Sequence, residues 1–285
     1  MISILIPTKN EERDLGDCLK SVAWSDDIHV YDSYSTDRTA EIALAAGARV
    51  IRRPHQDPAV AFGGNEAEHR NWGLTNIPFK YRWVFHIDAD ERVTPQLAAS
   101  LTAAVAAAGD HAAFRVRRRD FFMNRWLKHV QASPYYIRLF RPERIRYERL
   151  INPIARVDGT LGELCGFLDH HPFSKGVSHW LARHNSYSTF EAQQIAANRS
   201  KQAKFSLLKA FGAKDFHERR VHQKELFYRL PARPLFKFFL LYVLKLGFLD
   251  GRAGFTYAVL QSIYEYMIVL KTAEITADAS VPHGS

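Results

Sequence analysis

The chain has 285 residues, 47% of them hydrophobic and 13% aromatic, so it can fill the core of one large domain and is not globally disordered. Two cysteines, Cys18 and Cys165, argue against a disulfide framework and indicate a reducing compartment. The first residues run directly into an apolar strand without a signal peptide, and no apolar run reaches the roughly 20 residues that span a bilayer, so we expect a cytoplasmic protein.

Strand and helix patterns alternate along residues 1–110. The expected strands are 2–7, 28–32, 49–51 and 81–87. Helices are expected between them near 15–23, 40–46 and 66–75, followed by an alanine-rich helix that Thr94 caps, Pro95 opens and Gly109 ends. This βαβαβ order predicts a mostly parallel sheet with helices on both faces, and ligands bind beyond the carboxyl ends of such strands.

Asp88-Ala89-Asp90 lies at the carboxyl end of the fourth expected strand. Two carboxylates one residue apart can hold Mg²⁺ or Mn²⁺ against a diphosphate, because these cations prefer carboxylate oxygen and substrate phosphate. The alternative is that Asp88, Asp90 and Glu91 only place negative charge at the start of the next helix. The cation site is favoured because the segments Thr8–Glu11 and Asp32–Asp37 fall at the same sheet edge.

Two further acids lie near the end of the second strand. A carboxylate at Asp32 can accept hydrogen bonds from a nucleotide base or ribose, and a turn role within Asp32-Ser33-Tyr34-Ser35 is the alternative. Thr36 or Asp37 is expected to cap the helix that follows.

Residues 111–190 show another pattern, with strands expected at 113–119 and 135–140 and helical periodicity resuming near Thr189. The first of these strands carries arginine at every second position, at Arg115, Arg117 and Arg119. These arginines form either a solvated strand edge or a site for the phosphate of a lipid carrier, since guanidinium groups bind phosphate oxygens in pairs.

Positive charge is concentrated between residues 199 and 237, where eleven lysines and arginines stand against three acids, a net charge of +8. A segment with this much positive charge is expected to bind an anionic partner, either membrane lipid or nucleic acid. The sequence has no zinc-ligand spacing, RNP-like motif or basic zipper, so no nucleic-acid partner is expected and a basic nucleic-acid-binding protein is the weaker alternative.

An apolar run at 235–249 follows the basic segment, and Arg233, Lys237 and Lys245 share one helical stripe along it. A helix of this kind suits an anionic membrane surface, and a buried helix with snorkelling lysines is the alternative. A second apolar helix over 255–270 is expected to pack against the first and to carry Gln261 and Glu265 on its polar side.

Several of these motifs together resemble family 2 glycosyltransferases. The matching segments keep the family's order and spacing across about 110 residues, and they are Ser3–Glu12, Asp32–Thr39, Arg70-Asn71 and His86–Glu91. The ending Gly247–Phe255 resembles bacterial members that act on lipopolysaccharide-core or exopolysaccharide intermediates, including enzymes similar to colanic acid glycosyltransferases. With this ending the resemblance covers most of the chain.

The resemblance implies a GT-A fold and an inverting, metal-dependent transfer of a hexose-type sugar from a nucleotide-sugar donor to a lipid-linked saccharide acceptor. It implies donor-binding roles for a set of residues along the nucleotide, ribose and diphosphate: Pro7, Thr8, Asn10, Glu11, Asp32, Arg70, Asn71 and Asp88. It makes Asp90 the main ligand of Mg²⁺ or Mn²⁺, with Asp88 and His170 as further ligands, although His170 beside His171 also fits an ordinary surface residue.

The chain departs from the family at the catalytic base. Relatives of the core-glucosyltransferase type carry Val-His-Glu after an Arg-Leu-Phe-Arg strand, whereas this chain has Arg138-Leu139-Phe140-Arg141 and then Ile151-Asn152-Pro153. An inverting displacement needs a group that takes the proton of the acceptor hydroxyl. Glu163 and Glu148 are the candidates, and either also fits a plain surface acid.

The chain is therefore expected to comprise a donor-binding half at 1–110, an acceptor-binding half at 111–190 and a basic, apolar helical extension at 191–285. The extension would attach the enzyme peripherally to the inner face of the cytoplasmic membrane. A nucleotidyltransferase of related fold is an alternative. That class usually shows a Gly-rich basic signature near the first strand, where this chain has Lys9-Asn10-Glu11-Glu12.

Overall fold

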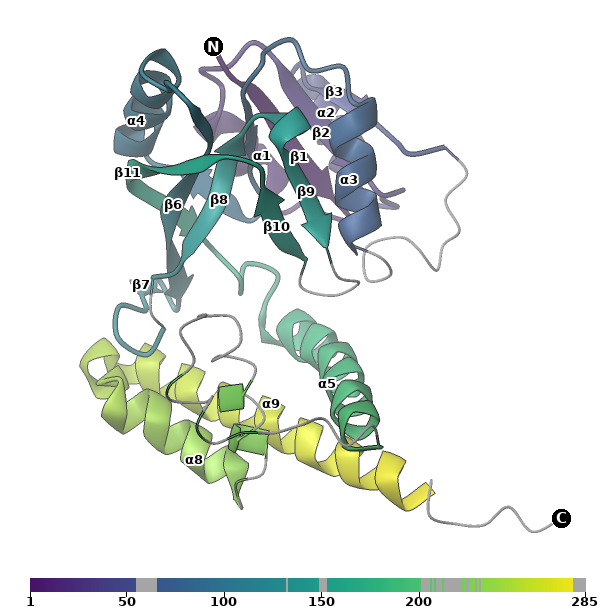
Figure 1. The fold of residues 1–285 in the computed structure, drawn as a ribbon, viewed down its shortest axis with the longest axis vertical. Coiled ribbons are helices and arrows are strands. Elements are labelled where there is room, and N and C mark those ends of the chain that lie inside the picture. Colours follow the sequence, from purple (N-terminus) through teal and green to yellow (C-terminus); the bar gives the residue numbers. More distant parts are fainter. Residues whose placement is uncertain are drawn as a thin grey trace, which may run out of the picture. The chain divides into compact units, whose positions relative to one another are not determined.

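The computed structural model describes residues 1–54, 66–131, 133–148, 153–200 and 232–278, together with 206, 208, 212, 222–223, 226–228 and 230. The chain forms two compact units (Figure 1). Unit 1 comprises Met1–Phe121 and Ser133–Ser174, and unit 2 comprises Phe122–Ala132 and Lys175–Ser285. The division into donor, acceptor and helical parts is one of function and stays a prediction.

Unit 1 is built around a mixed sheet with the strand order β3-β2-β1-β4-β8-β6-β11-β5. The strands expected from the first third are present, as β1 (Ser3–Thr8), β2 (Ile28–Asp32), β3 (Arg49–Ile51) and β4 (Val84–His86). These four run parallel to one another. The other strands of the sheet are β5 (Glu91–Val93), β6 (His111–Phe122), β8 (Tyr135–Phe140) and β11 (Thr160–His170).

The second half of the sheet mixes strand directions. Strand β8 is antiparallel to both β4 and β6, β11 is parallel to β6, and β5 is antiparallel to β11. A separate hairpin-like pair consists of β9 (Ile145–Glu148) and β10 (Ile154–Val157), and a short 3₁₀ turn, η1 (Pro142–Arg144), precedes it. The predicted parallel sheet is therefore confirmed for β1–β4 and becomes mixed beyond them.

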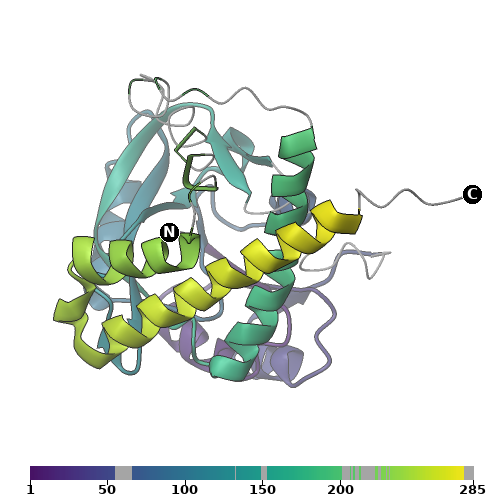
Figure 2. The same ribbon diagram turned by 90° about the horizontal axis from the view of Figure 1, so that it is seen from below.

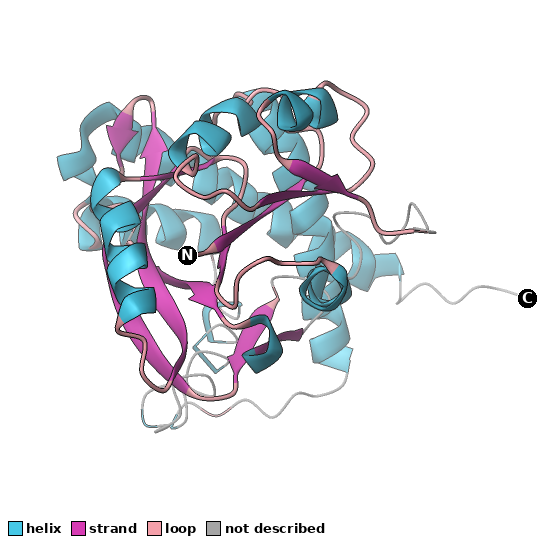
Figure 3. Cartoon of the chain, turned by 90° about the horizontal axis from the view of Figure 1, so that it is seen from above, coloured by secondary structure: helices cyan, strands magenta, loops and turns pink. Residues whose placement is uncertain are grey.

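Helices cover both faces of the sheet (Figure 3). Because side chains alternate along a strand, Ile4 and Ile6 of β1 point into one core and Leu5 into the other. The first core also contains side chains of α1 (Leu15–Ser21), α2 (Thr39–Ala45) and α4 (Pro95–Ala106). The second contains α3 (Glu66–Asn76) and β9. The expected α/β class with helices on both faces is confirmed.

The start of α4 follows the sequence prediction. The Thr94 hydroxyl accepts a hydrogen bond from the Leu97 backbone N–H at 3.3 Å, and Pro95 occupies the first turn, where its missing N–H costs nothing. The helix ends at Ala106, earlier than the predicted end at Gly109.

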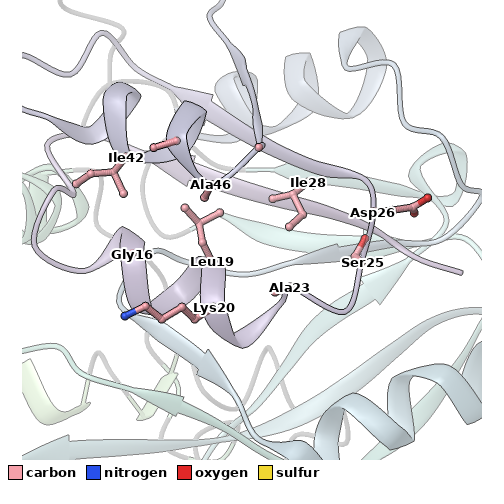
Figure 4. Close-up of a pocket in the computed structure, with 11 residues that line it drawn as sticks. Gly16, Leu19, Lys20, Ala23, Ser25, Asp26, Ile28, Ile42 and Ala46 are labelled. Carbon is pink, nitrogen blue, oxygen red and sulfur yellow. The ribbon is translucent and has the colours of Figure 1, made fainter.

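A hollow between α1 and α2 lies at the amino end of β2 (Figure 4). Leu19 and Lys20 line it from α1, Ile42 and Ala46 from α2, and Ile28 from the start of the strand. It therefore lies at the opposite end of β2 from Asp32, and in such sheets ligands bind at the carboxyl ends.

Unit 2 contains the short strand β7 (Arg125–Trp126) and the helices α5 (Val177–Ser200), α8 (Arg233–Phe239) and α9 (Gly251–Asp278). Helix α9 runs beside α8 and crosses α5 (Figures 1 and 2). Helix α5 begins well before Thr189, the position where the sequence pattern placed it. Within the ranges that the structure describes, no helix is both long and apolar enough to cross a membrane.

The prediction of a single helix over residues 235–249 is wrong. Helix α8 continues into a π-helical turn, η2 (Leu240–Leu244), and the chain then reverses into a 3₁₀ turn, η3 (Gly247–Asp250). Leu246 takes a left-handed conformation with φ of 59°. Gly247 packs so closely that a Cβ atom there would lie 2.5 Å from the Leu241 carbonyl oxygen, so the reversal requires glycine.

Protonation of His69 is expected to destabilise unit 1 in acid. The ring is buried, stacks on Tyr31 at 4.1 Å and lies 3.2 Å from the Ser33 hydroxyl. Burial, together with the charges of Arg70 and Arg53, lowers the pKa of His69 from 6.5 to about 4. The unfolded chain therefore takes up a proton that the native protein does not, so stability is full above pH 6.5 and falls as the pH approaches 4.

The loss amounts to at most about 3 kcal/mol in the free energy of unfolding. Urea unfolding of the wild type and of His69→Gln at pH 6.5 and pH 4 measures it. The variant should lose this part of the pH dependence, and an unchanged difference between the two pH values would contradict the assignment to His69.

Candidate functional site

The loops after β1 and β2 meet at the carboxyl edge of the parallel strands and are joined by hydrogen bonds. The Asn10 backbone N–H donates to the Ser35 hydroxyl at 2.8 Å, and the Thr36 N–H donates to the Asn10 side-chain oxygen at 2.8 Å. The Glu11 N–H donates to the Thr39 hydroxyl at 2.7 Å. The structure thus brings the first two predicted donor segments together, as expected for parallel neighbours.

Asp32 is fully buried, and neighbouring side chains donate hydrogen bonds to its carboxylate. Its carboxylate accepts hydrogen bonds from the Thr8 hydroxyl at 3.3 Å, the Ser35 hydroxyl at 2.5 Å and the Arg52 Nε at 2.8 Å. Asp37 likewise accepts a bond from the Thr39 N–H at 3.0 Å, at the start of α2. Both acids shape the loops that line the edge of the sheet.

Asp88 lies in a buried charge network that Arg138 of β8 organises. The Arg138 Nη2 lies 2.7 Å from Asp88 Oδ2 and 2.5 Å from Glu91 Oε1, and the Asp88 N–H donates to Glu91 at 3.0 Å. Burial alone would raise the pKa of Asp88, but the charge and hydrogen bond of Arg138, together with the charges of His86 and Arg70, outweigh it and hold that pKa well below its usual value. Burial raises the pKa of Glu91. Asp88 is therefore ionised and already paired.

Asp90 faces His170, which β11 carries to the same place. The His170 Nε2 lies 3.3 Å from Asp90 Oδ2, and the His171 N–H donates to the Asp90 carbonyl at 2.9 Å. On its other side the His170 Nδ1 bonds to Asp120 of β6. Burial alone would lower the pKa of His170, but the two carboxylates raise it to about 9. His170 lies beside Asp90 because β11 pairs with β5, directly after the aspartates.

Across the described part of the chain, no three His, Cys, Asp or Glu side chains form a ready-made metal centre. Asp90 Oδ2 and His170 Nε2 are nonetheless separated by 3.3 Å, close to the roughly 3 Å between neighbouring ligands of an octahedral Mg²⁺. Such a cation takes only one or two protein carboxylates and completes its shell with water and substrate phosphate. The pair Asp90–His170 therefore fits a divalent cation better than Asp88, which Arg138 holds.

Arg70 and Asn71 of α3 connect this network to β9. The Arg70 Nη1 donates to the ring of His86 at 3.2 Å, and its guanidinium stacks over Tyr147 at 5.4 Å. The Asn71 side chain exchanges two hydrogen bonds with the Tyr147 backbone, at 2.8 and 2.9 Å. Pro7, Arg70, His86 and Tyr147 all line one small cavity at this edge.

The two candidate bases occupy different surroundings. Glu148 follows Tyr147 on β9, so its side chain points to the face of the strand that carries Arg146, opposite the Tyr147 ring. It pairs with Arg156 and Arg146 at 3.0 Å each, and the hydrogen bond from Arg156 lowers the pKa of Glu148. Residues 149–152, which include Ile151 and Asn152, lie outside the described residues.

Glu163 is not brought near the aspartates. It lies seven residues before His170 on β11, a separation of roughly 20 Å at about 3.3 Å per residue. Its carboxylate is bound by Tyr135 and by Arg115 at 3.1 Å, and the hydrogen bond from Tyr135 lowers the pKa of Glu163. Its role as a base stays a prediction from sequence.

Three residues of the site were not predicted. Arg138, Glu91 and Asp120 are all at most 5% exposed, and each contacts a predicted site residue. A sequence signal existed for Arg138, a single arginine between apolar residues of a strand, because a lone buried charge needs an opposite partner. Nothing in the sequence spacing pointed Asp120 towards His170.

Comparison with known proteins identifies the family of the chain. The model of the family described as glycosyl transferase family 2 matches residues 3–162. The chain is 27% identical over 284 residues to the lipopolysaccharide core biosynthesis glycosyltransferase LpsC of Rhizobium meliloti (strain 1021), covering 95% of this chain and 91% of that protein. It is 34% identical over 97 residues to the uncharacterized glycosyltransferase RT0209 of Rickettsia typhi, covering 34% of this chain and 30% of that one.

A solved structure, glucosyl-3-phosphoglycerate synthase from Mycobacterium tuberculosis in complex with Mn²⁺ and UDP-glucose, is 26% identical with a TM-score of 0.33, over 42% of this chain and 43% of that one. The family match covers more than half of the 285 residues and includes the β1 and β2 loops, Arg70-Asn71 and the aspartates. The chain therefore belongs to glycosyl transferase family 2 and is a glycosyltransferase.

Proposed function

We propose that the protein transfers a sugar, with inversion, from a nucleotide-sugar donor to a lipid-linked saccharide acceptor, and that the transfer depends on a divalent cation. The observation that carries the proposal is the pair Asp90–His170 at the carboxyl edge of the sheet, at 3.3 Å. The joined loops of Asn10, Glu11 and Asp32 lie at the same edge, where nucleotides bind in sheets of this type.

The donor would lie along this edge. Pro7, Thr8, Asn10, Glu11 and Asp32 would border the nucleotide, and Arg70 and Asn71 would lie nearer the diphosphate. Asp90 and His170 would hold Mg²⁺ or Mn²⁺ once His170 has lost its Nε2 proton, and the cation would neutralise negative charge as the nucleoside diphosphate leaves. Asp88, held ionised by Arg138, would accept hydrogen bonds from ribose or donor sugar and add negative charge beside the cation.

The acceptor hydroxyl must lose a proton during an inverting displacement. Of the two candidates, Glu148 lies on the strand whose Tyr147 contacts Arg70 and Asn71, whereas Glu163 lies far along β11. We therefore place the base at Glu148. Its pairing with Arg156 and Arg146 keeps it ionised.

The acceptor class rests on the relative named for lipopolysaccharide core biosynthesis, which covers 95% of this chain. A lipid-linked saccharide places the enzyme at an anionic membrane surface, on its cytoplasmic side. The alternating arginines of β6 are already engaged, Arg115 with Glu163 at 3.1 Å and Arg119 with Asp169 at 2.5 Å. A phosphate of the carrier would have to compete with these carboxylates.

A nucleotide-release screen over UDP-, GDP- and dTDP-sugars tests the proposal. With Mg²⁺ or Mn²⁺ present, one donor class should be hydrolysed well above the others, and chelation should reduce the rate by about a hundredfold or more, because the cation supplies several kcal/mol of charge stabilisation. Nucleotide release that continues undiminished under chelator would contradict the cation's role.

A further inference from the structure

The pairing of α8 with α9 in unit 2 buries charge and exposes apolar side chains. Arg233 of α8 and Glu265 of α9, 4% and 5% exposed, form an ion pair at 3.1 Å. The sequence had placed Arg233 on an exposed basic stripe and Glu265 on a polar outer side, and both expectations are wrong. Helices at a water-exposed surface normally point their charged side chains outward and their apolar side chains inward. The helix pair α8–α9 has the opposite arrangement.

Apolar side chains run along the outside of both helices. On α8 and its continuation η2, Leu235, Phe239 and Val243 are spaced four apart and are 74%, 48% and 41% exposed. On α9, the exposed Phe255, Ile263, Tyr266 and Leu270 fall on one face of a helix with 3.6 residues per turn. Rows of exposed apolar side chains such as these mark a candidate interaction site.

The reversal between the two helices presents more apolar side chains, and it is held rigidly. Leu244, Leu246, Phe248 and Leu249 are all exposed there. A Cβ atom at Gly254 would lie 2.1 Å from the Gly247 carbonyl oxygen, so the two backbones touch. The buried Asp250 anchors the turn by accepting hydrogen bonds from the His129 and Val130 N–H groups, at 2.9 and 2.8 Å.

The charge around this surface has one sign. From residue 232 to 273 the only acids are Asp250 and Glu265, and both are buried. The exposed Glu274 lies about one helical turn beyond Leu270, near the carboxyl end of α9. Lys245 and Arg252 are exposed at the turn and at the first turn of α9, and Lys237 lies on α8. An apolar surface bordered by cations over residues 232–273, with no exposed acid in that range, complements an anionic bilayer, whose surface attracts each Lys or Arg.

We propose that the outer face of α8, η2, η3 and α9 docks on an anionic lipid bilayer, with both helices lying in the plane of the interface. The apolar side chains would enter the boundary between headgroups and acyl chains, and Lys245 and Arg252 would meet lipid phosphates. The inference deepens the membrane association that forms part of the proposed function and rests on it. It assigns that association to a two-helix face rather than to one basic helix.

Vesicle flotation of the full-length protein tests the docking face. Wild type should float with phosphatidylcholine vesicles that contain phosphatidylglycerol. Leu235→Glu/Ile263→Glu should bind these vesicles at least about tenfold more weakly. Each substitution replaces an apolar side chain that would enter the bilayer with a negative charge that the anionic lipid repels. The matched control is Leu44→Glu/Leu161→Glu, at unit 1 positions that are 63% and 47% exposed, and it should float like wild type.

A second variant tests the electrostatic contribution to vesicle binding. Lys245→Gln/Arg252→Gln should weaken binding to the anionic vesicles by about an order of magnitude, and raised salt should reproduce the loss in the wild type. Thermal unfolding checks that all variants are folded. Undiminished flotation of Leu235→Glu/Ile263→Glu, or a wild type that does not float, overturns the proposal.

If instead that variant turns a dimer into a monomer in sedimentation while vesicle binding is unchanged, the face joins two copies of the chain and the lipid proposal is overturned. Nucleotide release from the donor, measured without lipid, separates this inference from the proposed function. Leu235→Glu/Ile263→Glu should release nucleotide normally but not float, whereas a variant at Asp90 should float but not release nucleotide.

Discussion

Asp90→Ala is expected to lower sugar transfer by about a hundredfold to a thousandfold while the protein stays folded. Arg138 already pairs with Asp88 at 2.7 Å, so Asp90 is the carboxylate of the two that can turn to a cation beside His170. Loss of the cation's principal ligand removes several kcal/mol of charge stabilisation from the transition state. The measurement is the initial rate of transfer at saturating metal, alongside thermal unfolding.

A matched control is Asp17→Ala on α1, where the carboxylate is exposed and pairs with Lys20 at 2.9 Å. That variant should transfer sugar at the wild-type rate. Full activity of Asp90→Ala in the presence of a chelator would show that neither the residue nor a cation serves the reaction.

Arg138→Met is expected to lower the free energy of unfolding by about 3 kcal/mol, because it leaves the buried carboxylate of Glu91 and the partly exposed carboxylate of Asp88 without Arg138. Arg138 is 5% exposed and contacts both Asp88 and Glu91, at 2.7 and 2.5 Å. Methionine fills much of the same volume but supplies neither charge nor hydrogen bonds. Urea unfolding monitored by tryptophan fluorescence gives the difference.

Two comparisons make the Arg138 result specific. Arg156→Met removes an exposed arginine that pairs with Glu148, and it should cost at most about 1 kcal/mol. Arg138→Lys keeps the charge but cannot contact two carboxylates through a planar fork, so an intermediate loss is expected. A loss for Arg138→Met no larger than that for Arg156→Met would mean that the buried network contributes little to stability.

The strands and helices of the first third could be predicted because their signals are local. Alternation of apolar residues, the Thr94 cap and the Pro95 start depend on neighbours in sequence, and β1 to β4 and α4 appear close to where these signals place them. The long apolar run at 235–249 misled the prediction. Its interruption depends on the close approach of Gly247 to Leu241, which periodicity does not report.

In the helical extension, the sequence also failed to predict which side chains are buried and which are exposed. The sequence assigns Glu265 to an outer, polar side because charged residues on helices usually face water. The structure pairs it with Arg233 inside and turns Ile263 and Tyr266 outward. Which face of an apolar helix is buried depends on what packs against it, and that partner is distant in sequence.

By itself, the sequence determined the family and the parallel direction of the first four strands, and with the family resemblance it supplied the candidate ligands Asp88, Asp90 and His170, because these depend on local patterns and motifs. Only the tertiary structure decided how they divide their roles. Strand β8 brings Arg138 to Asp88, and the pairing of β11 with β5 brings His170 to Asp90. A buried charge goes to the nearest opposite charge in space, and that choice is made by strand pairing rather than by spacing along the chain.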